Sequence, residues 1–200
     1  MAERARLRGL LLVGGQSTRM GEPKQLLRLD GLTFAERVAR SLAAVTDDLL
    51  LAGAGPLPAA LDAHRRLTDV PGVPGPLAGL LAALRHDPGA AWLVAACDLP
   101  RCSPEALRWL LAHRAAAAPA VIPSRGGRPE PLLALYEPAI LPHAEALALE
   151  ARPGPRALAA VPGVLTPEVP PALAAAFTNV NTPGELAALA SAVANPAPPE

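Results

Sequence analysis

The segment of this chain best suited to chemistry lies near its amino terminus, where residues 11–27 read LLVGGQSTRMGEPKQLL. An apolar run stops at Gly14 and Gly15, and a polar loop follows that carries Arg19 and Lys24. Glycines have no Cβ, so the backbone N–H groups of such a loop can turn toward phosphate oxygens. Arginine can bind two phosphate oxygens with its planar fork, and lysine supplies a compact charge. These residue types predict a binding loop for a polyphosphate.

The loop matches neither of two common phosphate-binding fingerprints, GxGxxG and GxxxxGKS/T. An ordinary glycine-rich turn with two solvated cations is the alternative interpretation. Lys24, however, is the only lysine in the chain, whereas arginine occurs throughout. Arginine can replace lysine on a solvated surface but not where a compact ammonium must fit among phosphates. The single lysine is therefore consistent with a phosphate-binding role.

A second candidate, Asp98, follows the apolar segment AWLVAA at residues 91–96 and precedes Pro100. Mg²⁺ is usually held by one or two carboxylates together with substrate phosphates and water. One aspartate at the end of a strand is therefore sufficient, and we expect Asp98 to bind the metal. The alternative is that Asp98 caps the following helix, but Ser103 already fills the capping position of the segment SPEA.

Segments of strand character alternate with segments of helical character, which is typical of an α/β domain with a mainly parallel sheet. We expect strands at residues 7–13, 48–52, 65–69, 91–96, 118–122 and 131–136, and helices at 33–45, 59–64, 76–84, 103–114, 139–149 and 183–193. Residues 151–176 are rich in proline and alanine and give no assignment, and Phe177–Asn181 is expected to be extended. Ligands of open α/β sheets bind at the carboxyl ends of the strands. We therefore expect the glycine-rich loop and Asp98 to meet at that edge.

Composition excludes several classes of function. Eighteen basic and eighteen acidic residues give no net charge, and aromatic residues make up 2% of the chain. Such a chain lacks the basic surface expected for nucleic acid or an anionic membrane, and it lacks base-stacking side chains. No apolar run reaches the roughly 18–20 residues that span a bilayer, and the polar first residues do not resemble a signal peptide. We expect a cytoplasmic protein in which Cys97 and Cys102 form neither a zinc site nor a disulfide.

The sequence GGQSTRMGEPK resembles the signature loop of the MobA-like nucleotidyltransferases, which runs roughly GGxSxRMGxxK. Three later segments resemble one branch of that family, the molybdenum cofactor guanylyltransferases: GPLAG at Gly75–Gly79, CDLP at Cys97–Pro100 and NVNTPGEL at Asn179–Leu186. The resemblance covers essentially the whole chain. It implies a Rossmann-like three-layer α/β/α domain with a mainly parallel sheet, as in nucleotide-diphospho-sugar transferases. One nucleotidyltransferase domain over 1–194 and a disordered tail at 195–200 are expected.

The same resemblance implies a reaction and a set of site residues. GTP and a molybdopterin-type cofactor would give the guanine dinucleotide cofactor and pyrophosphate, with Mg²⁺ as the metal. Transient contact with other cofactor-biosynthesis proteins or molybdoenzymes is implied as well. The positions that match the family are Asp98, Lys24 and Arg19 for catalysis; Leu12, Val13, Gly14, Gly15, Lys24, Asp69 and Asp98 for the nucleotide; Asn179 and Asn181 for the acceptor edge; and Asp98 for the metal.

Two departures from the family pattern concern base recognition. Pro23 stands directly before the lysine, where members often carry an aspartate, and Ala52 stands where some members have an asparagine near the base. The segment EPKQLL resembles the sister branch that transfers a cytidylyl group, so CTP is the rival donor. A sugar-1-phosphate nucleotidyltransferase and a nucleotide sensor without catalytic activity are further alternatives.

Several other polar residues have structural alternatives. Asp69 could be a turn residue, and Asn179 and Asn181 could bond their own backbone in a turn before Pro183. The last group flanks the glycine pair of SRGGRPE and could either receive the acceptor or belong to a solvated loop: Arg125, Arg128 and Glu130. The four histidines are scattered along helical segments, and we expect none of them to be catalytic.

Overall fold

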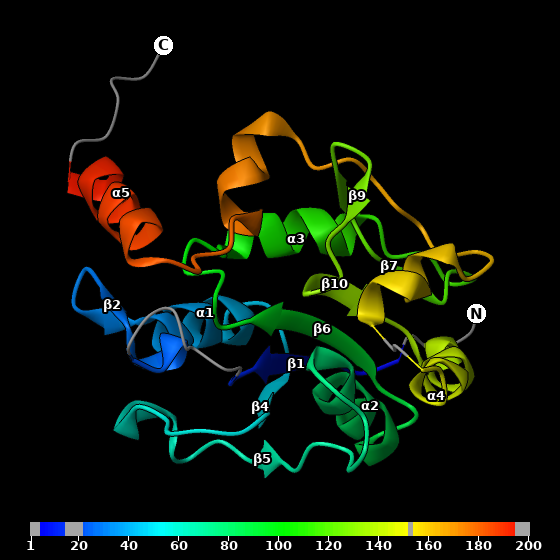
Figure 1. Ribbon diagram of the computed structural model, residues 1–200. Helices are drawn as coiled ribbons and strands as arrows, with labels where there is room; N and C mark the ends of the chain where they lie inside the picture. The colour runs from blue at the N-terminus through cyan, green and yellow to red at the C-terminus, as the bar shows by residue number, and fades with distance from the viewer. Residues whose placement is uncertain (1–4, 15–21, 152–153, 195–200) are drawn as a thin grey trace.

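The computed structural model describes residues 5–14, 22–151 and 154–194. Within these ranges, six strands form a central sheet that lies between layers of helices (Figure 1). Their order is β5 (Arg66–Leu67), β4 (Asp48–Ala52), β1 (Leu7–Leu12), β6 (Ala91–Ala96), β10 (Leu133–Tyr136) and β7 (Ala120–Val121). The first four are parallel, and β10 runs antiparallel to both of its neighbours. The predicted three-layer fold with a mainly parallel sheet is confirmed.

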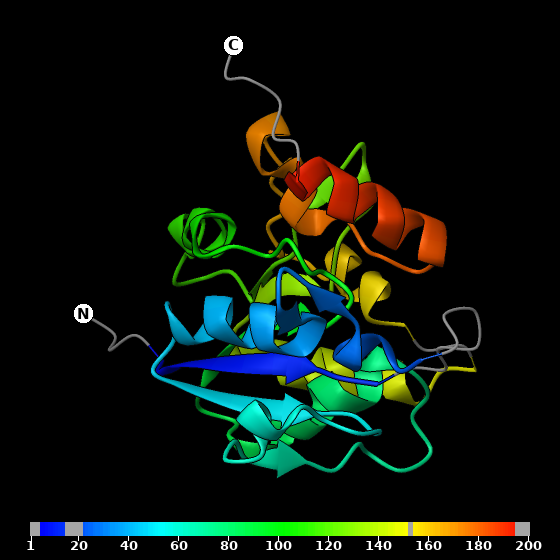
Figure 2. The same cartoon turned by 90° about the vertical axis from the view of Figure 1, so that its left-hand side faces the viewer.

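The helices cover both faces of the sheet. Helix α1 packs with α3 on one face, and α2 packs with α4 on the other (Figures 1 and 2). The helices are α1 (Phe34–Ala43), α2 (Pro76–His86), α3 (Pro104–Ala112), α4 (Leu141–Ala148) and α5 (Pro183–Ala194). Local sequence explains where they begin: Thr33 and Glu36 form a reciprocal capping box at α1, and the Ser103 hydroxyl accepts from Ala106 N at α3. The capping role expected for Ser103 is confirmed.

Three parallel strands end at the same level. Leu12, the last residue of β1, pairs with Ala52 of β4 on one side and with Ala96 of β6 on the other. The ladder continues one step further, because Val13 N donates to Ala52 O (2.8 Å) and Cys97 N donates to Leu12 O (2.9 Å). Residues that follow these strands are therefore held side by side by the backbone.

The turns beyond β1 and β4 approach each other so closely that only glycine fits. Gly14 and Gly53 have φ values of 97° and 113°, which favour glycine. A Cβ on Gly53 would lie 1.7 Å from Val13 O, and a Cβ on Gly14 would lie 2.5 Å from Ala54 O. The two turns thus form a bare-backbone surface at the carboxyl edge of the sheet.

Some predicted elements differ from the structure. The helix expected at 139–149 is divided into a short 3₁₀ helix and α4, and Phe177 ends a 3₁₀ helix instead of being extended. The segment left unassigned at 151–176 contains one 3₁₀ helix and most of another, and a parallel bridge from Leu165 to Val121 joins it to the sheet edge. A second parallel bridge joins Glu168 to Ser124, which lies beyond the edge strand. The 3₁₀ helices are η1 (Lys24–Leu26), η2 (Ala59–Leu61), η3 (Pro138–Ile140), η4 (Pro155–Ala160) and η5 (Pro171–Phe177).

Two small hairpins were not expected as strands. They are β2–β3 (Arg28–Leu29 and Leu32–Thr33) and β8–β9 (Ser124–Arg125 and Arg128–Pro129). Both turns have two residues with positive φ: Asp30 and Gly31 in the first, and Gly126 and Gly127 in the second. Such pairs are typical of tight two-residue hairpins.

The buried side chains form a main core on both faces of the sheet and a smaller cluster beside it. The smaller cluster, hereafter the satellite cluster, contains Leu27, Leu29, Phe34 and Val180, with Leu186 and Leu189 of α5 packed against it. No helix within the described ranges is both long and apolar enough to cross a membrane.

The close approach of the two glycine turns gives a test of the fold. We expect Gly53→Ala to lower the free energy of unfolding by about 2–5 kcal/mol, since strain at positive φ adds to a clash with backbone atoms. Gly31→Ala is the matched control, because Gly31 also has positive φ (77°) but nothing lies within 4 Å of its Cβ position. That control should lose only about 1–2 kcal/mol. Urea denaturation measures both values, and equal losses would contradict the close approach.

Candidate active site

Asp98 lies at the carboxyl edge of the sheet, two residues beyond the end of β6. Its side chain is 18% exposed, and burial raises the pKa of this carboxyl, although the nearby Lys24 ammonium lowers it. The Oδ1 atom is buried and makes no hydrogen bond to any described residue. The carboxylate therefore retains the capacity to bind a further partner.

Lys24 lies directly beside this carboxylate. Its Nζ is 3.5 Å from Asp98 Oδ2, and it donates to Oδ1 of Asn181 (2.5 Å). The lysine begins η1, which starts after Pro23, where φ is −59° and the carbonyl accepts from Leu26 N (2.9 Å). Three residues from distant parts of the chain therefore meet at one point, and one polyphosphate can reach both the ammonium and the carboxylate.

The NVN segment is attached to the loop that carries Asp98. Val180 N donates to Asp98 O (2.9 Å), and the Val180 side chain is buried in the satellite cluster. Asn179 and Asn181 stand on either side of this anchor in the chain. Asn181 contacts Lys24, whereas Asn179 lines a separate cavity. The two asparagines thus belong to different parts of the site.

A cavity of about 370 Å³ opens at the ends of β1, β4 and β6. Its volume is in the usual range for small-molecule sites. Its walls are mostly apolar side chains and bare backbone, with two carboxylates. The lining residues are Leu12, Val13, Gly14, Ala52, Gly53, Ala54, Asp69, Val73, Gly75, Pro76, Ala78, Gly79, Ala96, Cys97, Asp98 and Leu132.

Asp69 is the second carboxylate of this cavity. Its Oδ1 is buried without a hydrogen-bond partner among the described residues and lies 3.3 Å from the Cβ position of Gly79. Burial raises the pKa of the Asp69 carboxyl, while Arg66 and the Gly53 backbone lower it. A half-buried carboxylate with an unused oxygen is suited to accept hydrogen bonds from a ligand.

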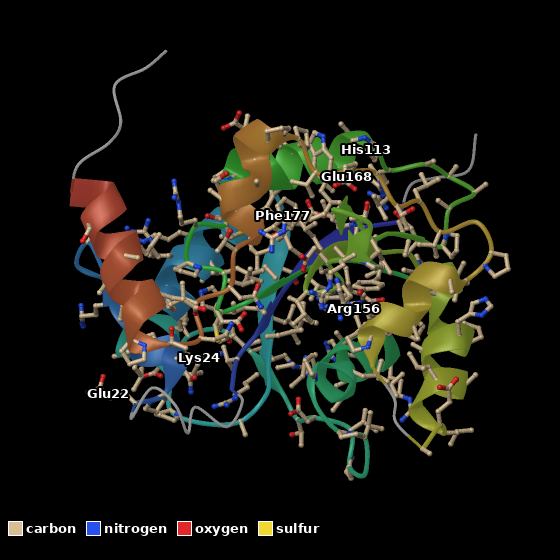
Figure 3. The ribbon with its side chains drawn as sticks, turned by 45° about the horizontal axis from the view of Figure 1, so that its top comes forward. Glu22, Lys24, His113, Arg156, Glu168 and Phe177 are labelled. Atoms are coloured by element: carbon tan, nitrogen blue, oxygen red, sulfur yellow. The ribbon has the colours of Figure 1, made fainter. Side chains whose placement is uncertain are left out.

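A second cavity of about 270 Å³ lies next to the first and shares Pro76 and Leu132 with it. It is lined by Pro76, Leu99, Glu130, Pro131, Leu132, Leu133, Gly154, Pro155, Arg156, Phe177 and Asn179. Arg156 Nε donates to Pro129 O (3.2 Å), and Arg125 lies 3.4 Å from Glu130. Figure 3 shows Lys24 near the start of α5, and Phe177 and Arg156 on η5 and η4.

The structure brings together most of the residues that the sequence singled out. Leu12, Val13, Gly14, Asp69 and Asp98 line one cavity, and Lys24 and Asn181 meet Asp98 at its rim. Gly15 and Arg19 lie outside the described residues, as does the tail at 195–200. Arg125 and Arg128 do not line either cavity. The roles of these residues stay predictions.

The two cysteines are poorly suited to act as acids or bases, and His113 packs against an aromatic ring. Cys97 and Cys102 are free and buried, and burial raises the pKa of each thiol to about 12. His113 stacks edge-on against Trp109, with ring centroids 4.8 Å apart. No group of three or more possible metal ligands of the His, Cys, Asp or Glu type occurs among the described residues. A metal at Asp98 would therefore need substrate phosphates and water to complete its ligands.

Sequence reasoning missed three residues around the site. Gln25 is 2% exposed and donates from Nε2 to Pro56 O (3.1 Å), which ties η1 to the turn after β4. Arg156 supplies the cation of the second cavity. The Glu185 carboxylate accepts from the backbone N–H of Asn181 (2.6 Å). Of the three, only Glu185 could have been identified from the sequence, because Thr182 and Glu185 have the spacing of a capping box.

A model of the MobA-like NTP transferase domain matches residues 9–164 of the chain. The chain belongs to this family. The matched range includes Lys24, Asp69 and Asp98, and the NVN segment follows it.

Relatives with names of their own are similar to this MobA-like transferase. A probable molybdenum cofactor guanylyltransferase of Bacillus cytotoxicus is 31% identical over 136 residues, which are 64% of this chain and 67% of the relative. A protein of the same name from Bacillus cereus is 29% identical over 133 residues, 64% of this chain and 66% of the relative. The chain thus spans about two thirds of the length of these relatives.

Solved structures also resemble the MobA-like chain. Molybdopterin-guanine dinucleotide biosynthesis protein A from Archaeoglobus fulgidus has a TM-score of 0.76 and 25% identity, and the match covers 94% of this chain and 98% of that one. A 4-diphosphocytidyl-2C-methyl-D-erythritol synthase from Anaerococcus prevotii has a TM-score of 0.70 over 96% of this chain and 97% of that one. Its 10% identity supports the fold alone. The MobA-like chain is a nucleotidyltransferase.

The position of Lys24 predicts a specific binding defect. Lys24→Ala should weaken binding of a nucleoside triphosphate by roughly 10- to 100-fold, because a charge-assisted contact to phosphate contributes about 1.5–3 kcal/mol. Binding of the matching nucleoside, which has no phosphate, should stay within about twofold of the parent protein. Isothermal titration calorimetry measures both. Equal weakening for nucleoside and triphosphate would show that the lysine does not act on the phosphates.

Proposed function

We propose that the protein transfers a guanylyl group from GTP to the terminal phosphate of a molybdopterin-type acceptor and releases pyrophosphate. The observation that carries this proposal is the meeting of Lys24, Asn181 and Asp98 at the rim of a cavity large enough for a nucleoside. The names of the relatives support the choice of donor and acceptor. Arg19 and Gly15, in the signature loop, would complete the phosphate site.

Nucleotidyl transfer requires positioning and charge neutralisation more than covalent catalysis by the protein. An oxygen of the acceptor phosphate attacks the α-phosphorus, the bond from that phosphorus to the β-phosphate oxygen breaks, and pyrophosphate leaves. In our proposal the Lys24 ammonium neutralises charge on the triphosphate and on the departing pyrophosphate. Bare backbone at Gly14 and Gly53 lets the nucleotide approach the ends of the strands.

The donor set at Asp98 fits Mg²⁺. Its carboxylate has one oxygen near Lys24 and another that makes no hydrogen bond to a described residue, so a hard cation could bind there. When bound, Mg²⁺ would neutralise phosphate charge and align the donor with its leaving group. Asp98 would hold the ion, and the phosphates and water would supply its remaining ligands.

Asp69 supports guanine as the base. Guanine presents two neighbouring donors, N1–H and the N2 amino group, and a carboxylate can accept both. Cytosine presents only one donor beside an acceptor nitrogen on the same edge, which a carboxylate would repel. Because Asp69 has an unused buried oxygen in the cavity, we assign it to the guanine edge.

The second cavity is suited to the acceptor. Asp98 lines the first cavity and its neighbour Leu99 lines the second, so a ligand there would lie close to the reacting phosphate. Glu130 is paired with Arg125, which leaves Arg156 as the cation of this cavity that can receive a phosphate. Phe177 and the prolines provide apolar walls for the body of the acceptor.

Replacement of Asp98 tests the proposed chemistry. Asp98→Asn should reduce GTP-dependent pyrophosphate release with purified molybdopterin by at least about 1,000-fold, because the metal and its charge stabilisation are lost. The folded protein should unfold at the same or a higher temperature, since burial disfavours the charged form of Asp98. The assay includes CTP beside GTP. Faster release with CTP would contradict the guanylyl assignment, and normal turnover of the variant would contradict the role of Asp98.

The raised pKa of Asp69 predicts how guanosine binding depends on pH. Ionised Asp69 accepts the two guanine donors, so affinity should fall as the pH decreases from neutrality toward the raised pKa of Asp69. Guanosine is the probe because it carries no phosphate and does not involve the metal. Asp69→Asn should bind guanosine more weakly at neutral pH and show a flat profile. A flat profile in the parent protein would refute the assignment of Asp69 to the base.

A further inference from the structure

The Glu185 carboxylate links the first turn of α5 to the chain that precedes it. Glu185 Oε2 accepts from Thr182 N (3.1 Å), and Glu185 N donates to the Thr182 hydroxyl (3.2 Å), which is a reciprocal capping box. The same oxygen also accepts from Asn181 N (2.6 Å). This additional bond lies outside the helix and adds nothing to the cap itself. It fixes the backbone of the residue that contacts Lys24.

The chain around Asn181 is held from both sides. Val180 N is bonded to Asp98 O, and Asn181 N is bonded to Glu185, so consecutive peptide groups are fixed. The Asn181 side chain extends from this fixed backbone, and its Oδ1 accepts from Lys24 Nζ. The carboxylate of Glu185 is therefore separated from the ammonium by one residue.

Packing reinforces this connection. Val180, next to Asn181, and Leu27, three residues after Lys24, are both buried in the satellite cluster. Leu186 and Leu189 of α5 pack against the same cluster, and Figure 1 shows α5 beside the β2–β3 hairpin. Among the described side chains of α5, Leu186 and Leu189 thus pack on the satellite cluster, which is separate from the main core.

The location of the Lys24 ammonium indicates what the contact with Asn181 contributes. Lysine has a long flexible side chain, and a nearby carboxylate would draw the ammonium into a direct contact of about 2.7–2.9 Å. Here Nζ lies 3.5 Å from Asp98 Oδ2, while the neutral Asn181 oxygen holds it at 2.5 Å. Asn181 thus shares the Lys24 ammonium with Asp98 and restricts where it lies between the two oxygens.

We propose that Glu185 is a positioning residue that acts on Lys24 through Asn181 and so sets the affinity of the protein for the phosphates of its nucleotide. The inference rests on the proposed function only in that a nucleoside triphosphate binds at Lys24. Glu185 does not contact the nucleotide in this arrangement. Its effect must therefore depend on the presence of Lys24 and on the presence of phosphates in the ligand.

The experiment is a double-mutant cycle read out by calorimetry with GTP and with guanosine. Glu185→Ala should weaken GTP binding by roughly 3- to 10-fold, because the competent arrangement of Asn181 becomes a smaller fraction of the population. Guanosine binding should stay within about twofold, since guanosine does not reach the ammonium. In a Lys24→Ala background the same change should have no further effect on GTP, which is the signature of coupled residues.

Two further variants separate positioning from helix stability. Glu185→Gln keeps an oxygen that can accept both N–H groups, so its GTP affinity should return to within about twofold of the parent. Glu36→Ala removes the matching carboxylate of the capping box at α1, which accepts from Thr33 N (2.7 Å). That control should lower the unfolding temperature, as Glu185→Ala should, but leave GTP affinity unchanged.

The inference is overturned if Glu185→Ala weakens GTP and guanosine equally, or if its effect is the same with and without Lys24. It is also overturned if Glu185→Gln binds GTP as weakly as Glu185→Ala. Failure of the proposed function gives a different result. If the parent protein binds CTP in place of GTP, the guanylyl assignment is wrong, and the same cycle is then completed with CTP and cytidine.

Discussion

The site depends on three parallel strands that end side by side at the same edge of the sheet. Backbone hydrogen bonds across β4, β1 and β6 continue one residue beyond the last paired positions, through Val13 and Cys97. The ladder fixes where the chain leaves each strand, so Gly14, Gly53 and Asp98 reach the same edge without help from their own side chains. This register comes from the backbone and the apolar core. Substitutions in the loops after the strands can therefore change the ligand that binds there without moving the strands.

The charges at this edge reduce stability in the absence of ligand. Asp98 and Asp69 each have a buried oxygen without a hydrogen bond to the described residues, and burial raises the pKa of both carboxyls. A folded chain selected for stability alone would pair or neutralise such groups. Their retention is consistent with partners that arrive with the substrate, namely the donors of a base and a cation with its phosphates. Lys24 offsets part of this penalty at Asp98.

The sequence predicted the central strands and the main helices well, and it predicted the small connecting elements poorly. Continuous apolar runs such as AWLVAA identified the buried strands, because a strand covered on both faces has no polar positions. Asp98 could be placed at the edge by that rule alone. The contact of Asn181 with Lys24 could not, because it joins positions 157 residues apart and depends on how α5 packs. Residues 151–176 also gave no periodic signal, since their 3₁₀ helices and single bridges involve few consecutive residues.

The two departures from the family pattern act on different parts of the site. Pro23 begins η1 through its carbonyl and fixed φ, so it orients Lys24 without adding a second acid beside the ammonium. Ala52 is fully buried, and its Cβ lies 3.1 Å from the Cβ position of Gly79. A polar group is thus missing from the end of β4, while Asp69 Oδ1 lies 3.3 Å from that same Cβ position. Asp69 is therefore close enough to serve as the acceptor for the base on this wall of the cavity, and recognition then depends on a charge that burial makes sensitive to pH.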